Sequence, residues 1–245
     1  MNRIQIIQRL IDINEKIIFY PKLKRFYRKT LSNNPVIIDV GANKGQTIDF
    51  FKSVRSTSQL FSFEANPTLV IQLQKKYEGV HNTTIIAKGV SNVEGFLKFN
   101  INKLDETSSF ESLNLNSKYL SKKASVLGVT VDEIIDDVIE VETITLNSFI
   151  TALDITKIDV LKIDTEGHEY KCLQGLFEKS VDNNDNQNYI VERIQIENHQ
   201  DDMYEHSESF DEITALLEKN NYVLEKKIKH GFGDFYECVF KYTKS

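Results

Sequence analysis

The chain has 245 residues, 40% of them hydrophobic and 27% charged, which indicates one globular domain of generous size with a substantial core. Its net charge of −6 argues against binding to nucleic acid. No segment approaches the ~18 consecutive apolar residues of a membrane span, and the amino terminus has no uninterrupted apolar run of the secretory kind. A cytoplasmic protein is therefore expected. Two cysteines, Cys172 and Cys238, lie far apart among apolar residues and are expected to be core thiols.

Residues 1–34 are predicted to form a basic, amphipathic helical extension ahead of a single domain that spans residues 35–245. Residues 1–31 contain eight Lys or Arg and two acidic residues, a net charge of +6 that leaves −12 for the remainder. The apolar residues of this segment recur at helical spacing. Two interpretations remain open. We favour a helix packed on the domain with its lysines directed to water. The alternative is a helix that contacts an acidic inner-membrane surface or grips an anionic substrate.

Residues 36–51 predict a buried strand, a glycine turn and a helix, which is the opening of a nucleotide-cofactor site. The dinucleotide fingerprint is not matched, because Asn43 and Gln46 stand where its second and third glycines should be. The carboxylate of Asp39, beside a positive helix N-terminus, instead suits a ligand that carries an ammonium and a carboxylate together. S-adenosylmethionine carries both in its methionine part, although a structural turn without a ligand is the alternative. The residues expected to hold that part are Asp39, Gly41, Ala42, Asn43 and Gly45.

Two further strand ends are expected to complete this cofactor site. Glu64 lies about 20 residues beyond the glycine turn, the spacing at which an acidic residue reaches ribose hydroxyls, and Asn66 follows it at a helix start. Ser91 and Asn92 follow an apolar strand over residues 83–90, where a doubly wound sheet places an adenine ring. A surface glutamate and an ordinary turn are the alternatives at these two places.

Residues 102–139 fit no repeating α/β unit and are polar, rich in Ser, Asn and Lys. Insertions of this length at the ligand edge of a sheet are usually lids or substrate loops. We expect this segment to select the substrate, with a merely flexible connection as the alternative. Residues 96–101 ahead of it alternate like an added antiparallel strand.

Residues 158–169 form the second strong motif, a buried strand that ends at Asp164 and leads through a polar turn into a helix. As strand four, next to strand one, it should place Asp164 across the switch point from Gly41, where the reactive end of a cofactor projects. Residues 190–197 are expected to be strand five, and residues 222–242 an alternating terminal hairpin.

Four motifs resemble, in this order, those of the FkbM family of S-adenosylmethionine-dependent O-methyltransferases. They are Asp39-Val-Gly-Ala-Asn-Lys-Gly45, Phe63-Glu-Ala-Asn-Pro67, Val90-Ser-Asn92 and Lys162-Ile-Asp-Thr-Glu-Gly-His-Glu169. The resemblance implies a Rossmann-like seven-stranded α/β sheet in the order 3-2-1-4-5-7-6, with the last strand antiparallel, and methyl transfer to a hydroxyl of a sugar, glycan or secondary-metabolite alcohol. It places the methionine end of S-adenosyl-L-methionine at Asp39, Gly41 and Asn43, the ribose at Glu64, and the adenine near Ser91 and Asn92. The extension and the insertion lie outside the recognisable core, so the acceptor stays unassigned.

Methyl transfer from a sulfonium to an alcohol requires in-line alignment and a base that accepts the hydroxyl proton. His199, at the end of strand five, is the preferred base and His168 is the second candidate, since an unperturbed histidine pKa of about 6.5 suits the task. A structural role is an equal alternative for each histidine. Asp164 and Glu166 are expected to orient the substrate hydroxyl or the cofactor ammonium. Together with Glu197 they could instead bind magnesium, although we favour a site without a metal.

Two other functions remain as alternatives. One is a nicotinamide-dependent oxidoreductase, against which the departure from the dinucleotide fingerprint argues. The other is a membrane-docked protein that binds the cofactor and catalyses no reaction. The acceptor is expected to be a small molecule or a glycan rather than nucleic acid, and the sequence predicts no particular oligomeric state.

Overall fold

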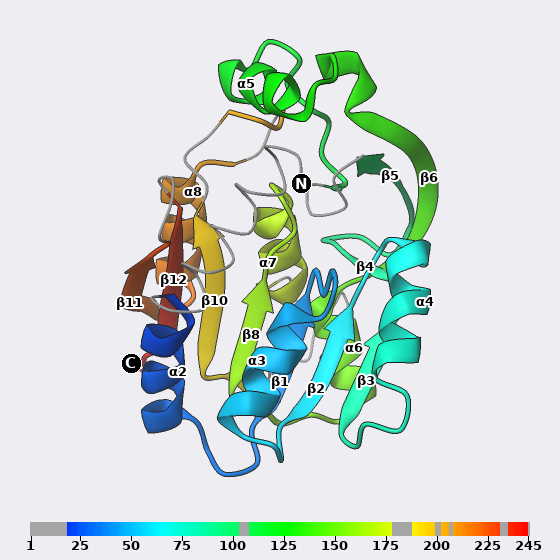
Figure 1. Ribbon diagram of the computed structural model, residues 1–245. Coiled ribbons are helices and arrows are strands. Elements are labelled where there is room, and N and C mark those ends of the chain that lie inside the picture. The colour runs from blue at the N-terminus through cyan, green and yellow to red at the C-terminus, as the bar shows by residue number, and fades with distance from the viewer. Residues whose placement is uncertain are drawn as a thin grey trace.

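The computed structural model describes residues 19–102, 108–177, 188–198, 202–205, 208–230 and 235–244. Its centre is a seven-stranded sheet with helices on both faces (Figure 1). In spatial order its strands are β11 (Tyr222–Lys229), β12 (Tyr236–Tyr242), β10 (Arg193–Asn198), β8 (Val160–Ile163), β1 (Val36–Val40), β2 (Gln59–Phe63) and β3 (Thr83–Ile86). The five strands from β10 to β3 are parallel, and β12 runs antiparallel between β10 and β11. The predicted order 3-2-1-4-5-7-6, with the last strand antiparallel, is confirmed.

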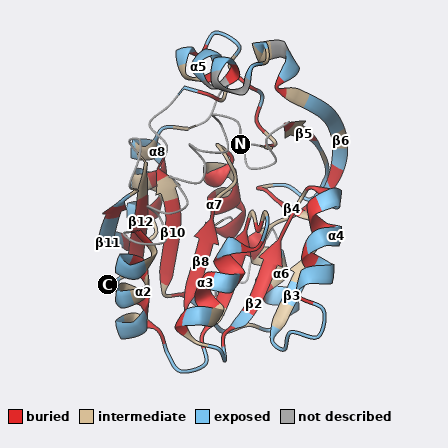
Figure 2. Ribbon diagram, in the orientation of Figure 1, coloured by how far each residue is buried: buried red, intermediate tan, exposed pale blue. Residues whose placement is uncertain are grey.

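Seven α-helices accompany the strands within the described ranges. They are α2 (Tyr20–Thr30), α3 (Gln46–Val54), α4 (Pro67–Lys76), α5 (Lys118–Leu127), α6 (Leu146–Ala152), α7 (Glu169–Phe177) and α8 (Phe210–Lys219), with a short 3-10 turn at Val131–Glu133. Neighbouring residues of a strand point to opposite faces, so a sheet covered by helices on both sides needs unbroken apolar strands. Ile37 of β1 accordingly belongs to the hydrophobic cluster that includes residues of α2 and α3, and Ile38 belongs to the cluster that includes residues of α6, α7 and α8. Figure 2 shows the resulting buried centre, with exposed residues on the outer helix surfaces.

The third strand is shorter than predicted. It was expected over residues 83–90, but β3 ends at Ile86, and Gly89–Val90 form β4 of a separate sheet with β6 (Ile135–Ile144) and β5 (Gly95–Asn102). The N–H of Lys88 donates to the carbonyl of Ile86 at 3.0 Å, a tight turn that ends the ladder of β3. A further short pair, β7 (Lys157–Ile158) and β9 (Ile190–Val191), precedes β8 and β10.

The inserted segment builds a small unit of its own above the carboxyl ends of the parallel strands (Figure 1). Its β5 pairs with β6 as an antiparallel ribbon, which confirms the strand expected at residues 96–101 and extends it. The hydrophobic cluster of this unit combines Leu120 and Ala124 of α5 with Leu113, Ile134 and Met203. Because Met203 follows β10, the unit is fastened to the main domain. Residues 103–107 of the expected insertion lie outside the described ranges.

The described part of the amino-terminal extension is packed on the sheet. In α2, Leu23 and Tyr27 are buried, and the hydroxyl of Tyr27 donates to the side-chain carbonyl of Gln195 on β10. The predicted helical face within residues 1–18 lies outside the described residues. Among the helices that the structure describes, none has the length and apolar character to cross a bilayer.

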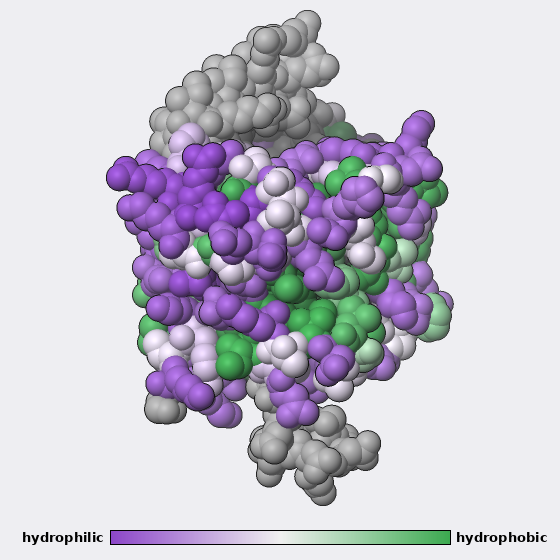
Figure 3. All heavy atoms as spheres, turned by 90° about the horizontal axis from the view of Figure 1, so that it is seen from below, coloured by the Kyte–Doolittle hydropathy of each residue, from purple (hydrophilic) through white to green (hydrophobic). Residues whose placement is uncertain are grey.

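The end of the molecule opposite the inserted unit is seen from below in Figure 3, where hydrophilic side chains surround a hydrophobic area. The loops at this end precede the parallel strands, and the sequence predicts no site residue in them. Ligands of open α/β sheets bind at the other end, beyond the carboxyl ends of the strands. The predicted site residues accordingly follow those ends.

Candidate functional site

The glycine turn after β1 brings the first and fourth predicted motifs into contact. Gly41 has φ +87°, and a Cβ atom at this position would stand 1.9 Å from the backbone oxygen of Asp164. Only a residue without a side chain allows β1 and β8 to approach so closely at their carboxyl ends. The N–H groups of Gly41 and Ala42 both donate to the carbonyl of Phe63, at 3.1 and 2.9 Å. Asp164 thus lies beside Gly41, as the strand order requires.

Glu64 connects the turn to the end of β2. The residue is 6% exposed, and its two carboxylate oxygens accept the backbone N–H groups of Asn43 at 2.7 Å and Asn66 at 2.8 Å. Asn43 has φ +47°, a conformation in which asparagine is one of the more frequent non-glycine residues. Burial raises the pKa of Glu64 to about 7, and the hydrogen bonds from Asn66 and Asn43 oppose that rise. Each carboxylate oxygen keeps a lone pair for a further donor.

Asp39 is a fully buried carboxylate near the carboxyl end of β1. No well-aligned hydrogen bond from the described residues reaches either of its oxygens, although the hydroxyls of Ser62 and Thr47 lie near them. The side-chain oxygen of Asn43 likewise accepts no hydrogen bond from the described residues. Burial raises the pKa of Asp39 to about 6, while the positive charge of Lys162 and those two hydroxyls oppose the rise. A buried acceptor without a donor is costly, so these oxygens are suited to a ligand that brings one.

Lys162 is a buried cation within an otherwise apolar strand. It pairs in register with Asp39 on β1 and Gln195 on β10, and its ammonium donates to Asp164 at 2.7 Å. Burial lowers the pKa of Lys162, but the negative charges of Asp164 and Glu237 outweigh that effect and raise it overall. The ammonium therefore stays charged and holds the Asp164 carboxylate at the edge of the sheet.

Glu237 lies on the same face, in β12. Its carboxylate accepts the side-chain N–H of Gln195 at 2.9 Å, so a chain of buried polar groups runs from Tyr27 on α2 through Gln195 to Glu237. Burial raises the pKa of Glu237 to about 7, and the charge of Lys162 opposes the rise. The position of α2 is thereby linked to the polar groups behind the candidate site.

His168 is held between two buried partners. Its Nδ1 lies 2.6 Å from a carboxylate oxygen of Glu111, and its Nε2 lies 2.9 Å from the hydroxyl of Ser91. The same Glu111 oxygen accepts the ammonium of Lys171 at 2.7 Å. Burial raises the pKa of Glu111, but the hydrogen bonds from His168 and Lys171 outweigh it and lower the pKa overall. With His168 2% exposed and both nitrogens bonded, this arrangement favours a positioning role over that of a base.

The turn between β8 and α7 anchors the inserted unit. Glu166 has φ +55°, its carbonyl accepts the hydroxyl of Ser109 at 2.7 Å, and its carboxylate accepts the hydroxyl of Tyr204 at 3.1 Å. Tyr204 also lies over Gly167, where a Cβ atom would stand 3.1 Å from its ring. Through Ser109 and Glu111, the inserted unit rests directly on the fourth motif. Tyr204 adds a contact from the segment that follows β10.

The family model described as the methyltransferase FkbM domain matches residues 39–224, more than half of the chain. The chain belongs to the FkbM methyltransferase family.

One curated relative and two solved structures illustrate its similarity to known proteins. The 2-O-methyltransferase NoeI of Sinorhizobium fredii is 25% identical over 146 residues, which cover 58% of this FkbM chain and 57% of that protein. An rRNA methylase from Streptococcus thermophilus is 8% identical, with 91% of this chain and 95% of that chain covered and a TM-score of 0.46. A fibrillarin pre-rRNA processing protein of Methanococcus jannaschii is 11% identical, with 87% and 68% covered and a TM-score of 0.47. The strand order described above, rather than these likenesses, defines the fold.

Several predicted cofactor residues of the FkbM domain have neighbours within the protein. Gly45 was expected to keep the cofactor site open, but a Cβ atom there would meet the hydroxyl of Tyr77 at 2.3 Å, so this glycine makes room for α4 packing. The side chain of Asn66 accepts the N–H of Thr68 at 3.0 Å and caps α4. The amide of Asn92 donates to Gln174 on α7 at 3.1 Å. These contacts connect the three residues to α4 and α7, and their predicted role in binding the cofactor stays a prediction.

The predicted base, His199, lies outside the part of the chain that the structure describes, whereas the carboxylates of the metal alternative lie within it. Within the described part of the FkbM chain, no group of three or more His, Cys, Asp or Glu side chains is arranged to hold a metal ion. Glu166 accepts a hydrogen bond from Tyr204, and Asp164 accepts one from Lys162, so these two carboxylates, of the three considered as magnesium ligands, have protein partners.

Five polar residues of this region were not predicted as site residues from the sequence. They are Tyr27, Glu111, Lys162, Gln195 and Glu237. The sequence pattern could have identified Lys162, since a charged residue inside a buried apolar strand requires a charged or hydrogen-bonding partner. No such pattern identifies Glu111, because it lies in an irregular segment and meets His168 only through the folding of the insertion.

Proposed function

We propose that this FkbM-family chain is an S-adenosylmethionine-dependent O-methyltransferase whose acceptor is a hydroxyl of a sugar, glycan or secondary-metabolite alcohol. The observation that carries the proposal is the pair of buried carboxylates at neighbouring strand ends. Asp39 is fully buried and receives no well-aligned hydrogen bond from the described residues, with only the hydroxyls of Ser62 and Thr47 close to it. Glu64 keeps lone pairs beyond its two backbone bonds. A ligand with both an ammonium and a ribose provides the donors that these two groups lack.

The residues present fit this cofactor. Asp39 and the side-chain oxygen of Asn43 would accept hydrogen bonds from the ammonium of the methionine part. Glu64 would accept the ribose hydroxyls, and Val90, which is buried beside Ser91, would contribute an apolar wall near the adenine. When bound, S-adenosylmethionine supplies a methyl group on a sulfonium, ready for in-line displacement by an oxygen nucleophile.

The chain's own groups would then orient the acceptor and take up its proton. Asp164, 28% exposed in its side chain and held by Lys162, is positioned to accept a hydrogen bond from an acceptor hydroxyl. His199, which follows β10 in the sequence, remains the proposed base. We assign His168 a positioning role, because its two nitrogens are committed to Glu111 and Ser91.

The relative named above supports oxygen as the methyl acceptor, since its name assigns 2-O-methyl transfer to that protein. The alignment spans little more than half of its length, so the acceptor class remains part of the proposal. The inserted unit, which rests on the fourth motif at the carboxyl edge through Ser109 and Glu111, is the proposed substrate-selecting segment.

The test is binding of S-adenosylhomocysteine, measured as a rise in the melting temperature of the full chain. At a ligand concentration one hundred times the dissociation constant, the stabilisation should be about 2.7 kcal/mol. Asp39→Asn and Glu64→Gln should lose most of the shift, whereas Glu94→Gln, at an exposed glutamate outside the site, should keep it. A shift with NAD and none with S-adenosylhomocysteine would favour an oxidoreductase and overturn the proposal.

A further inference from the structure

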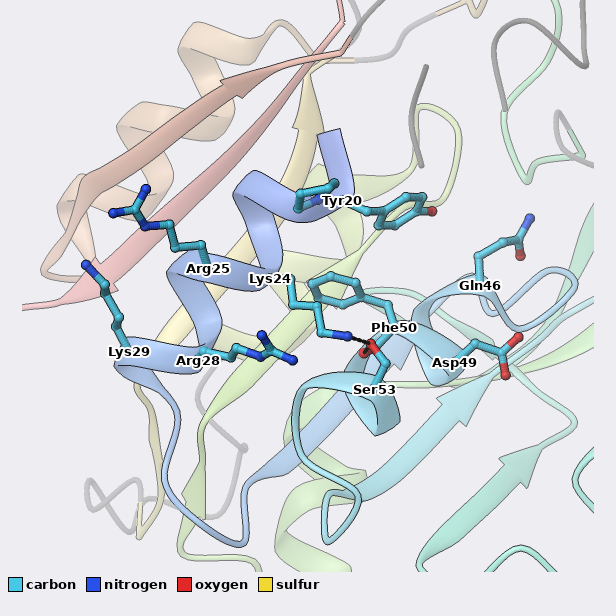
Figure 4. Close-up of a pocket in the computed structure, with 10 residues that line it drawn as sticks. Tyr20, Lys24, Arg25, Arg28, Lys29, Gln46, Asp49, Phe50 and Ser53 are labelled. Atoms are coloured by element: carbon cyan, nitrogen blue, oxygen red, sulfur yellow. Dashed lines mark hydrogen bonds between the residues drawn. The ribbon is translucent and has the colours of Figure 1, made fainter. Parts of the chain in front are cut away.

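A groove of about 1050 Å³ lies between α2 and α3 (Figure 4). Its lining is Tyr20, Pro21, Lys24, Arg25, Arg28, Lys29, Gln46, Asp49, Phe50 and Ser53. Gln46 is the first residue of α3 and directly follows the glycine turn, whereas Ser53 lies near the end of that helix. The groove therefore begins beside the candidate cofactor site and follows α3 for roughly 10 Å, at 1.5 Å per residue.

The groove is strongly basic on its α2 side. Among residues 20–30 there are five Lys or Arg and no acidic residue beside them, in a chain whose net charge is −6. Lys24 and Arg28 extend from α2 toward α3, and Arg25 and Lys29 extend from the other side of the same helix (Figure 4). The ammonium of Lys24 donates to the hydroxyl of Ser53 at 3.0 Å, which leaves it two further donors.

These cations have no acidic partner in the part of the chain that the structure describes. Lys24, Arg25, Arg28 and Lys29 form no ion pair with any described residue. Asp49, the acid that lines the groove, already accepts the ammonium of Lys76 at 2.8 Å and the hydroxyl of Tyr77 at 2.8 Å. The positive charge of the groove is therefore not neutralised by the described residues around it.

The upper end of the groove is aromatic. The rings of Tyr20 and Phe50 lie 5.6 Å apart, tilted by 37°, and Phe50 packs in turn on Tyr27 of α2. An apolar floor with a few cations at one side is the usual composition of a small-molecule site. Arginine offers a planar fork and lysine a point charge, and both are suited to phosphate oxygens.

We propose that this groove binds the phosphate or diphosphate group of a soluble small molecule, and that the methyl acceptor is such a phosphorylated compound. The assignment of the acceptor rests on the proposed function, because the groove opens beside the turn that would hold the cofactor. Lys24 and Arg28 bind the phosphate, and the ring portion of the ligand lies on Tyr20 and Phe50. A soluble ligand is favoured over a membrane because Lys24 and Arg28 face into a concave surface, which a flat bilayer does not fill.

The experiment is calorimetric titration of the full chain with inorganic pyrophosphate. The double variant Lys24→Gln/Arg28→Gln should bind pyrophosphate at least tenfold more weakly than the unaltered chain. Lys22→Gln is the matched control, since Lys22 is an exposed cation of the same helix that does not line the groove, and its affinity should change less than twofold. Absence of binding to the unaltered chain, or an equal loss in the control, overturns the proposal.

A second titration tests the aromatic floor. Phenyl phosphate should bind more tightly than inorganic phosphate to the unaltered chain, and Tyr20→Ala should remove most of that difference. Equal affinity for the two probes would contradict the assigned orientation of the ligand. Co-sedimentation of the chain with vesicles of anionic phospholipid tests the membrane as an alternative ligand. If the chain co-sediments in a way that depends on Lys24 and Arg28 but does not bind pyrophosphate, the proposal of a soluble ligand is overturned.

The melting-temperature shift with S-adenosylhomocysteine separates this proposal from the proposed function. The Lys24→Gln/Arg28→Gln variant should retain the full shift, because neither side chain belongs to the cofactor site. If the unaltered chain binds pyrophosphate in the groove but shows no shift, the phosphate site is supported and the assignment to a methyl acceptor is overturned.

Discussion

Replacement of Gly41 by alanine isolates the contact on which the site is built. The new methyl carbon would stand 1.9 Å from the backbone oxygen of Asp164, whereas real contacts of this kind essentially never fall below 3.0 Å. At least 1.1 Å of separation is therefore missing (3.0 Å less 1.9 Å), and it can come only from movement of β1 or β8. The residue also has φ +87°, which costs a residue with a side chain about 1–2 kcal/mol.

Gly79→Ala provides the matched control. Gly79 has φ +73°, and a Cβ atom added there would meet nothing within 4 Å, so this variant experiences the conformational cost alone. Alanine also lowers the conformational entropy of the unfolded chain, which stabilises both variants by about 0.4–1 kcal/mol. Overpacking adds about 1–3 kcal/mol or more at Gly41. Urea unfolding should show that Gly41→Ala loses more unfolding free energy than Gly79→Ala, by about the overpacking cost of 1–3 kcal/mol. Equal losses in the two variants would refute the close approach of β1 and β8.

Three further outcomes follow from the buried polar groups. Burial raises the pKa of Glu64 to about 7, so only about a tenth of the Glu64 carboxyl groups are ionised at pH 6. Calorimetry should therefore show that S-adenosylhomocysteine binds about tenfold more weakly at pH 6 than at high pH. Glu64→Gln should flatten that dependence. His168→Ala should lower the unfolding free energy by about 1–3 kcal/mol in urea titrations, because it leaves the buried carboxyl of Glu111 with one hydrogen-bond partner fewer. Tyr27→Phe should cost about 1–3 kcal/mol by the same measurement, because the side-chain carbonyl of Gln195 loses its donor; an unchanged midpoint would contradict the bond.

The fold was predictable because its strongest signals are local. Residues 36–40 and 160–163 are largely apolar, and each run leads to a polar turn, so both read as central parallel strands. The alternating terminal strands identified the hairpin in the same way. The division of strand three was not predictable, since Gly89 and Val90 leave the main sheet to pair with β6, which lies far along the chain.

The candidate site was predictable where its residues stand at strand ends. Asp39, Glu64 and Asp164 follow this rule, and strand order alone brings them to one edge. Glu111 contacts His168, which lies 57 residues further along the chain, from within an irregular segment. No periodic pattern in the sequence predicts this contact. Gly45 illustrates a different limit, because a glycine needed for a ligand and one needed for packing against Tyr77 look the same in the sequence.

The central claim is that the buried carboxylates at the ends of β1 and β2 bind the nucleoside of S-adenosylmethionine. A crystal structure of the full chain with S-adenosylhomocysteine tests it most directly. We predict the ribose hydroxyls within hydrogen-bond distance of Glu64 and the amino group beside Asp39 and the side-chain oxygen of Asn43. A nucleoside bound elsewhere, for example in the groove between α2 and α3, with no ligand atom within hydrogen-bond distance of Asp39, would contradict the account.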